Sequence, residues 1–176
     1  MNTQLKILIA EDNPDDVFFF KQAIKKASID CVLNSACDGI EALAYLNGQA
    51  AFSDRTVHPF PDVLLLDLNM PGMNGFEVLE WIRKDPRCSR LMVHVMSASS
   101  RDLDIQKAYD LGANSYIVKP SRIDELVRFV SALHQWHRFT AFPMRSEARG
   151  SAPQAVPGPD FPAANARVMQ PALAKV

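Results

Sequence analysis

The hydrophobic residues of this chain form two kinds of segment that alternate along the sequence. Short apolar runs predict buried parallel strands, and the longer amphipathic stretches between them predict helices. The expected strands lie near Leu5–Ala10, Cys31–Ala36, Asp62–Asp67, Leu91–Ser97 and Ser115–Lys119. The expected helices lie near Pro14–Ser28, Gly39–Asn47, Gly75–Lys84, Asp102–Leu111 and Ile123–His137. This alternation predicts an α/β fold, a doubly wound parallel sheet with helices on both faces.

Short polar signatures end four of the five apolar runs. They are Glu11-Asp12, Asp67, Ser97 and Lys119-Pro120, at the ends of the first, third, fourth and fifth expected strands. In an open α/β sheet, ligands bind outside the carboxyl ends of the strands. We therefore expect these residues to meet in one crevice, although they lie far apart in the sequence.

The acidic residues suit a phosphoryl group and a hard cation. Asp67 is the candidate nucleophile, because a carboxylate can attack a phosphoryl group and hold it as an aspartyl phosphate. Mg²⁺ prefers oxygen ligands and one or two protein carboxylates. Asp12 and Asp67 would bind the metal directly, and Glu11 directly or through water. The backbone carbonyl of Asn69, just beyond the strand, is placed to turn toward the same metal.

The other strand ends supply a positive charge and a hydroxyl. Lys119 would place its ammonium on a phosphoryl oxygen, and Ser97 could donate a hydrogen bond to a second one. Ala98 keeps the approach open. Pro120 follows the lysine, so a cis peptide bond is accessible there and would direct the lysine into the crevice.

Each signature alone has an ordinary structural explanation. A Glu-Asp pair at a strand end usually caps a helix or faces solvent, a Lys-Pro pair is usually a turn, and a serine after a strand is usually a cap. Four such signatures at four strand ends of one sheet favour a functional site instead.

At these residues the chain resembles the receiver domain of two-component response regulators, over about Gln4 to His137. The motifs are Glu11-Asp12, the Asp67-Leu68-Asn69-Met70-Pro71-Gly72 run with Gly75, Ser97-Ala98, and Tyr116 with Lys119-Pro120. The resemblance implies a flavodoxin-like sheet of strand order 2-1-3-4-5. It also implies that Asp67 is the phosphoacceptor and that Glu11, Asp12, Asp67 and the Asn69 carbonyl bind Mg²⁺. Ser97 and Tyr116 would be a coupled switch pair, and Lys119 the phosphate contact.

Two details are similar to single-domain regulators that pair with phytochrome-type histidine kinases. They are the run Glu11-Asp12-Asn13-Pro14-Asp15-Asp16 and the extended polar segment before Pro61. The resemblance implies a partner that is a sensor histidine kinase, of the phytochrome type in this case, or a histidine phosphotransfer protein. Within that long polar segment, we expect His58 to be exposed to solvent.

Composition indicates the compartment, the domain boundaries and the kinds of partner to expect. The chain has 176 residues and a formal net charge of −1, so bulk charge gives no attraction for nucleic acid or membranes. Cys31, Cys37 and Cys88 show no metal-ligand spacing and suit reduced thiols in the cytoplasm. Residues 140–176 carry six of the twelve prolines and no periodic pattern. We expect a receiver domain over 1–139 and a disordered Pro/Ala-rich tail over 140–176, too short for a DNA-binding output domain.

Two aromatic sets are candidate interaction surfaces. On the last expected helix, Phe129, Trp136 and Phe139 fall opposite the apolar residues expected to face the sheet. This stripe predicts a homodimer contact. Phe18 and Phe19 lie off the core face of the first helix, where they would suit a kinase's phosphohistidine helix.

Three classes of function remain open from the residues themselves. The first is an interaction module that a partner histidine kinase phosphorylates on Asp67, with at most slow catalysis of its own. The second is a Mg²⁺-dependent phosphatase of the haloacid-dehalogenase type, which needs an acid two residues after the nucleophile, where this chain has Asn69. The third is a scaffold that works without phosphorylation, which the intact acids and Lys119 disfavour.

Overall fold

The computed structural model describes residues 4–142 of the chain. Within them the elements run β1 (Leu5–Ala10), α1 (Pro14–Lys26), β2 (Cys31–Ala36), α2 (Gly39–Asn47), η1 (Ala50–Phe52), β3 (Val63–Leu66), α3 (Gly75–Lys84), β4 (Met92–Ser97), α4 (Asp102–Asp110), β5 (Ser115–Val118) and α5 (Ile123–Phe139). All strand pairs are parallel, and the sheet order is β2-β1-β3-β4-β5. The flavodoxin-like fold predicted from the sequence is confirmed. The expected tail lies outside the described residues except for 140–142.

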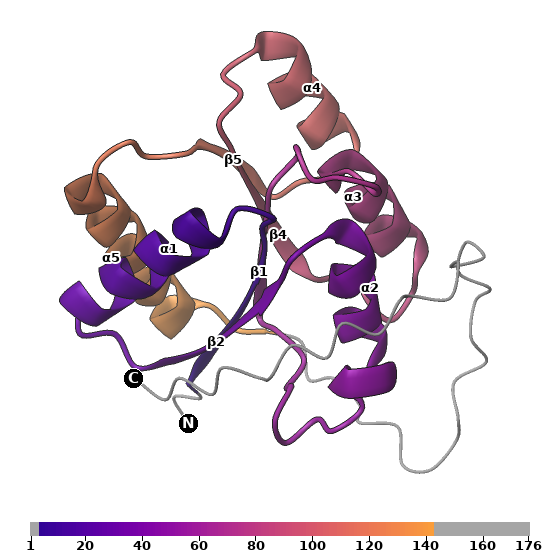
Figure 1. The fold of residues 1–176 in the computed structure, drawn as a ribbon, viewed down its shortest axis with the longest axis horizontal. Coiled ribbons are helices and arrows are strands. Elements are labelled where there is room, and N and C mark those ends of the chain that lie inside the picture. Colours follow the sequence, from indigo (N-terminus) through magenta and orange to yellow (C-terminus); the bar gives the residue numbers. More distant parts are fainter. Residues whose placement is uncertain (1–3, 143–176) are drawn as a thin grey trace. The chain divides into compact units, whose positions relative to one another are not determined.

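Two hydrophobic layers enclose the sheet. Figure 1 shows α1 and α5 on one face, and α2, α3 and α4 on the other. Side chains of β1 and β3 alternate between these layers: Leu8 and Leu64 pack with the three-helix side, whereas Ile7 and Leu65 pack with α1 and α5. Because both faces are covered, the central strands are apolar at nearly every position, as parallel strands require.

The first and third helices begin at asparagine caps close to the strand ends that carry the acids. The Asn13 side chain accepts a hydrogen bond from the Asp15 backbone N–H, and Pro14 occupies the first helical position. Asn74 and Glu77 form a reciprocal capping box at the start of α3. Such caps satisfy the free N–H groups of the first turn. They therefore set where α1 and α3 begin relative to the strand ends.

The segment between α2 and β3 packs closely against the domain. The Arg55 guanidinium donates to the backbone carbonyls of Tyr45 and Leu46, both at 2.8 Å, where α2 ends. The His58 ring lies edge-on to the Tyr45 and Phe52 rings, with centroids 5.8 and 5.2 Å away. His58 is therefore partly buried, and the expectation of a solvent-exposed histidine was wrong. The segment is anchored because Arg55 donates to carbonyls in the last turn of α2, where the regular hydrogen bonds of the helix end.

The aromatic residues of α5 lie differently from the outward stripe expected. Phe129 and Trp136 are partly buried and pack against the core layer formed with α1. Trp136 lies edge-on to the ring of His94 on β4, with centroids 5.8 Å apart. Phe139, at the end of the helix, is 88% exposed. The packed face of α5 is thus wider than the apolar residues alone indicated, because large aromatic side chains reach the core from its edge.

The partly buried imidazole of His94 should make the stability of the domain depend on pH. Burial lowers the pKa of His94 below its usual 6.5, so the folded protein binds this proton less readily than the unfolded chain. The stability that neutral His94 contributes is then present above pH 6.5 and lost as the pH falls through the lowered pKa.

We expect a His94→Phe variant to lose less stability than the wild type between about pH 7.5 and 5. Urea unfolding at several pH values measures the difference. A parallel pH dependence in the two proteins would show that His94 does not carry this effect.

Candidate functional site

Backbone hydrogen bonds continue the sheet register into the site. The Asp67 N–H donates to the Ala10 carbonyl at 3.0 Å, and the Lys119 N–H donates to the Ser97 carbonyl at 2.9 Å. Each polar signature is therefore tied to the end of the neighbouring strand. The structure brings Glu11, Asp12, Asp67 and Lys119 together at the carboxyl edge of the sheet, where the strand-end argument places a site.

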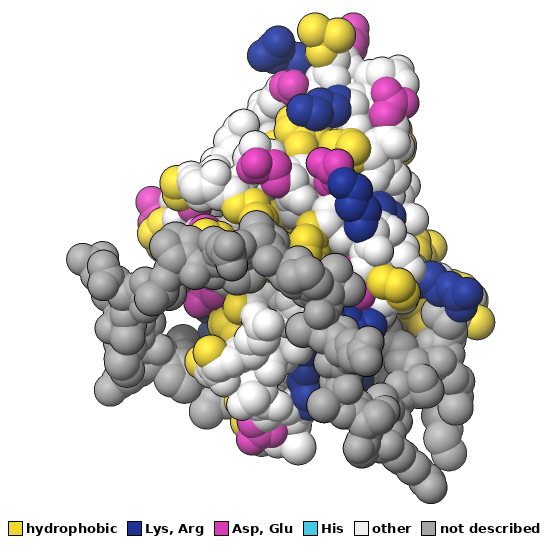
Figure 2. Space-filling view, turned by 90° about the vertical axis from the view of Figure 1, so that its right-hand side faces the viewer, with side chains coloured by type: hydrophobic (Ala, Val, Ile, Leu, Met, Phe, Trp, Pro, Cys, Tyr) yellow, Lys and Arg dark blue, Asp and Glu magenta, His cyan; other side chains and the backbone are white. Residues whose placement is uncertain are grey.

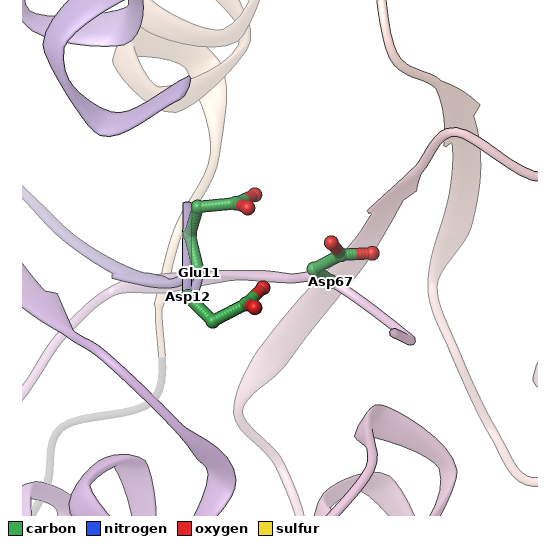
Figure 3. A group of neighbouring side chains, drawn as sticks. All are labelled: Glu11, Asp12 and Asp67. Carbon is green, nitrogen blue, oxygen red and sulfur yellow. The ribbon is translucent and has the colours of Figure 1, made fainter. Parts of the chain in front are cut away.

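Three carboxylates converge at this edge. Glu11, Asp12 and Asp67 each offer an oxygen, and these oxygens lie within 4.8 Å of one another. Figure 3 shows the Glu11 and Asp12 side chains extending from the end of β1 toward Asp67. Glu11 and Asp67 are only 3% and 6% exposed, whereas Asp12 is exposed. An all-oxygen set open to solvent on one side fits a hard divalent cation that keeps water ligands.

The residue two positions beyond Asp67 contacts it through the backbone. The Asn69 N–H donates to Oδ1 of Asp67 at 3.3 Å, and the Asn69 residue is exposed. This bond orients the Asp67 carboxylate. The role of the Asn69 carbonyl as a metal ligand stays a prediction.

Lys119 lies among three acids. Its Nζ donates to Oδ2 of Asp67 at 2.9 Å and to Oδ2 of Asp16 at 2.8 Å, and it forms an ion pair with Oε2 of Glu11 at 2.7 Å. None of the peptide bonds in the described range is cis. The ammonium thus reaches the site with Pro120 in the trans form, and the cis bond considered from the sequence is absent.

Asp16 is a site residue that the sequence did not predict. This residue stands in the first turn of α1, where acids are favoured simply because they face the positive end of the helix dipole. Because the helix dipole already accounts for an acid at this position, the sequence offered no reason to expect its contact with Lys119, which lies 103 positions away. Only the packing of α1 beside the end of β5 shows the pair.

The charges of the site influence one another. Burial raises the pKa of Glu11, while the hydrogen bond and charge of Lys119 oppose that rise. Burial also disfavours the charge of Lys119, but the hydrogen bonds of its ammonium to the carboxylates of Asp16, Glu11 and Asp67 outweigh that effect and raise the pKa of Lys119. Counting Asp12, four acids face one lysine. The excess negative charge favours a bound cation.

The expected switch residues are linked through the loop after β4. Ser97 is fully buried, and its Oγ accepts from the Ser99 N–H at 3.3 Å. The Tyr116 hydroxyl donates to the Ser99 carbonyl at 3.0 Å, and the Tyr116 ring packs partly buried against the core. Ala98 lies exposed between the two serines. Ser99 therefore connects Ser97 to Tyr116, which gives a path for coupling between them.

Gly75 lies in close contact with the backbone of Asp67. A Cβ at this position would lie 2.2 Å from the Asp67 carbonyl oxygen, closer than any side chain could approach. The Gly75 N–H also donates to the Leu68 carbonyl at 3.0 Å. The start of α3 therefore packs directly against the backbone that carries the candidate nucleophile, and only glycine fits there.

A groove opens beside the acids, between the start of α1 and the loop before α5. Phe18 and Phe19 are about half exposed near its edge, with ring centroids 6.0 Å apart. The groove combines an apolar floor with charged residues at the acidic site. Its lining residues are Asp16, Phe19, Phe20, Met96, Lys119, Pro120, Ser121, Arg122, Ile123 and Leu126.

The remaining visible surface is mixed in character. Figure 2 shows acidic, basic and hydrophobic side chains interspersed over the described part of one face. No helix within residues 4–142 has the length and apolarity needed to cross a membrane.

Comparison with known proteins agrees with this architecture. The family model described as "Response regulator receiver domain" matches residues 7–131. Response regulator Rcp1 of Synechocystis sp. (strain ATCC 27184 / PCC 6803 / Kazusa) is 32% identical over 130 residues, which cover 74% of this chain and 86% of Rcp1. The family match and this relative show where the chain belongs.

Solved structures of regulators are also similar to this chain. The phosphorylated cyanobacterial phytochrome response regulator RcpA is 34% identical, with a TM-score of 0.71, over 80% of this chain and 98% of RcpA. Response regulator RPA3017, in red light signaling of R. palustris, is 34% identical with a TM-score of 0.75, over 80% and 99% of the two chains. The Mn²⁺-bound form of Rcp1 is 30% identical with a TM-score of 0.69, over 80% and 99%. A relative thus binds a divalent metal, as the carboxylates here are arranged to do.

Removing one acid from the cluster should stabilise the metal-free protein. Asp12 is exposed and is not among the acids that contact Lys119, so Asp12→Asn relieves repulsion without breaking that network. We expect a gain of about 0.5–1 kcal/mol in the free energy of unfolding without metal. Added Mg²⁺ should cancel or reverse the gain, because the wild type binds the metal more tightly.

Urea unfolding with and without Mg²⁺ tests this, with Asp15→Asn as the matched loss of an exposed acid outside the cluster. A destabilised metal-free Asp12→Asn protein would show that the carboxylates do not repel one another appreciably.

Proposed function

Because the chain belongs to the family of response regulator receiver domains, we propose that Asp67 accepts a phosphoryl group from a partner histidine kinase. The observation that carries this proposal is the position of Lys119, whose Nζ lies 2.9 Å from Oδ2 of Asp67 while Glu11 and Asp12 face the same carboxylate. A nucleophile, a cation site and a fixed positive charge therefore share one edge of the sheet.

The proposed reaction is a phosphoryl transfer between two side chains. An Asp67 carboxylate oxygen forms a bond to phosphorus, the bond from phosphorus to the kinase's histidine nitrogen breaks, and its electron pair stays on the imidazole. Lys119 pairs with a phosphoryl oxygen during this exchange. A bound divalent cation would neutralise negative charge on the transferred group.

We propose Mg²⁺ as that cation, held by Glu11, Asp12, Asp67 and the carbonyl of Asn69. The support is chemical: Mg²⁺ takes oxygen ligands and usually combines few carboxylates with water and phosphate. The exposed Asp12 leaves room for water at the site. A Mn²⁺-bound relative supports a divalent ion at this position without distinguishing the two metals.

The partner we propose is a sensor histidine kinase, of the phytochrome type, or a histidine phosphotransfer protein. RcpA is described as a phytochrome response regulator, which supports the first choice. Lys119 and Phe19 line the groove between α1 and the loop before α5, and the half-exposed ring of Phe18 lies next to Phe19. An amphipathic helix with a phosphohistidine could bury its apolar face there and direct its imidazole toward Asp67.

The output we propose is a change of surface rather than turnover of a substrate. Ser97 would bond the phosphoryl group, and its link through Ser99 to Tyr116 would bias the surface of α4 and β5. Receiver domains are generally phosphoacceptors and not enzymes. The phosphatase and scaffold alternatives gain no support from the comparisons. We propose the cytoplasm as the compartment, because the cysteines suit reduced thiols and a sensor kinase would transfer its phosphoryl group there.

Phosphorylation should occur on Asp67 and require a divalent cation. With acetyl phosphate and Mg²⁺, wild type should gain one phosphoryl group, which intact mass detects, and Asp67→Asn should gain none. Asp62→Asn, which removes the acid just before β3, is the control and should be labelled like wild type. Labelling of Asp67→Asn, or labelling in excess EDTA, would contradict the assignment, and steady release of phosphate from a generic ester would favour the phosphatase.

We also propose a homodimer through α5, tightened by phosphorylation. Phe129 and Trp136 are partly buried, so their substitution would disturb the core, and the 88% exposed Phe139 gives the cleaner test. Phe139→Asp should weaken association about a hundredfold, because a homodimer loses one ring from each subunit and burying each ring contributes about 1.5 kcal/mol.

Sedimentation with and without phosphoryl donor measures association, and Leu103→Asp, an exposed residue of α4, is the control. A wild type that stays monomeric at high concentration in both states would rule the homodimer out.

A further inference from the structure

Asp16 contacts the lysine of the site but has no part in the chemistry described so far. We propose that Asp16 is a positioning residue that holds the ammonium of Lys119 at the phosphoryl site in both the free and the phosphorylated protein. This inference rests on the proposed function of Lys119 as the phosphate contact. It concerns a residue on a helix, α1, that carries none of the nucleophile or metal ligands.

The donors of Lys119 are all engaged in the unphosphorylated protein. An ammonium carries three N–H groups, and Nζ lies 2.7, 2.8 and 2.9 Å from oxygens of Glu11, Asp16 and Asp67. Two of these contacts are hydrogen bonds, to Asp16 and Asp67, and the third is an ion pair with Glu11. The position of Lys119 is therefore the result of three simultaneous contacts.

Two of these contacts are altered by the proposed reaction. Glu11 and Asp67 belong to the group of carboxylates that could hold a metal ion, and Asp16 does not. A bound cation would compete with Lys119 for Glu11, and phosphorylation would convert the Asp67 carboxylate into an acyl phosphate. Asp16 is the one acid of the three that neither event recruits. Its contact can persist while the other two donors turn to phosphoryl oxygens.

The helix that carries Asp16 is held in a fixed position. The Asn13 cap and the buried Phe20 and Ala23 hold α1 against the sheet. Lys119 comes from the end of β5, and both residues line the groove beside the site. Without the Asp16 contact, only Glu11 and Asp67 would hold the flexible lysine side chain. Because Glu11 would bind the metal and Asp67 would carry the phosphoryl group, Lys119 could then turn into this groove or toward water.

The test compares Asp16→Ala with Asp15→Ala in the full chain. Both changes remove one acid from the first turn of α1, but Asp15 is exposed and is not one of the acids that contact Lys119. The first measurement is the rate of phosphorylation by acetyl phosphate at saturating Mg²⁺. The second is the rate at which an amine-modifying reagent labels Lys119, read by peptide mass spectrometry.

We expect Asp16→Ala to slow phosphorylation about fivefold and to raise labelling of Lys119 about threefold, the size of one lost polar contact. Asp15→Ala should stay near wild type in both measurements, and Asp16→Glu should recover most of the rate. Equal behaviour of the two alanine variants would overturn the proposal, and so would slower phosphorylation with unchanged labelling of Lys119. If Lys119→Ala is phosphorylated as fast as wild type, the proposed function of Lys119 fails, whereas labelling still reports the Asp16 contact.

Discussion

Lys119 makes it possible to keep carboxylates at the end of a hydrophobic sheet. Removing an ionised carboxylate from water costs on the order of several kcal/mol unless a charge of opposite sign compensates it. Glu11 and Asp67 are almost completely buried, and one ammonium contacts both of them together with Asp16. The compensation is incomplete, since burial still raises the pKa of Glu11. The site therefore retains an excess of negative charge that a divalent cation would relieve.

The same imbalance links stability to function. A cluster that repels itself lowers the stability of the metal-free domain, and such a cost persists only where the surrounding structure holds the groups in place. Here the support is rigid: strand ends joined by backbone bonds, the Gly75 contact beneath Asp67, and capped helices beginning nearby. The backbone that carries the acids is held in place, so binding a cation at the cluster is a direct way to relieve their repulsion.

The site also lies where separate elements meet. Asp16 belongs to α1, Lys119 follows β5, and the groove beside them is lined from both sides. On the side of the site formed by β4, hydrogen bonds to Ser99 link Ser97 with Tyr116. Under the proposed function, a phosphoryl group on Asp67 would reach the docking groove through Lys119, which contacts Asp67, and the output surface through its bond to Ser97.

The sequence determined most of the fold and the identity of the central acids. Four of the five strands end in a polar signature, and parallel strands present their carboxyl ends on one edge, so the sequence alone could bring Glu11, Asp12, Asp67 and Lys119 together. Strand order came from the family resemblance, since periodicity alone does not order strands. Only the tertiary structure decided the burial and contacts of side chains whose neighbours come from distant segments. Phe129 and Trp136 reach the core edge, and His58 packs on Tyr45 and Phe52. Asp16 could not be identified from its position in a first helical turn, because its contact with Lys119 depends on how the start of α1 approaches the residue that follows β5.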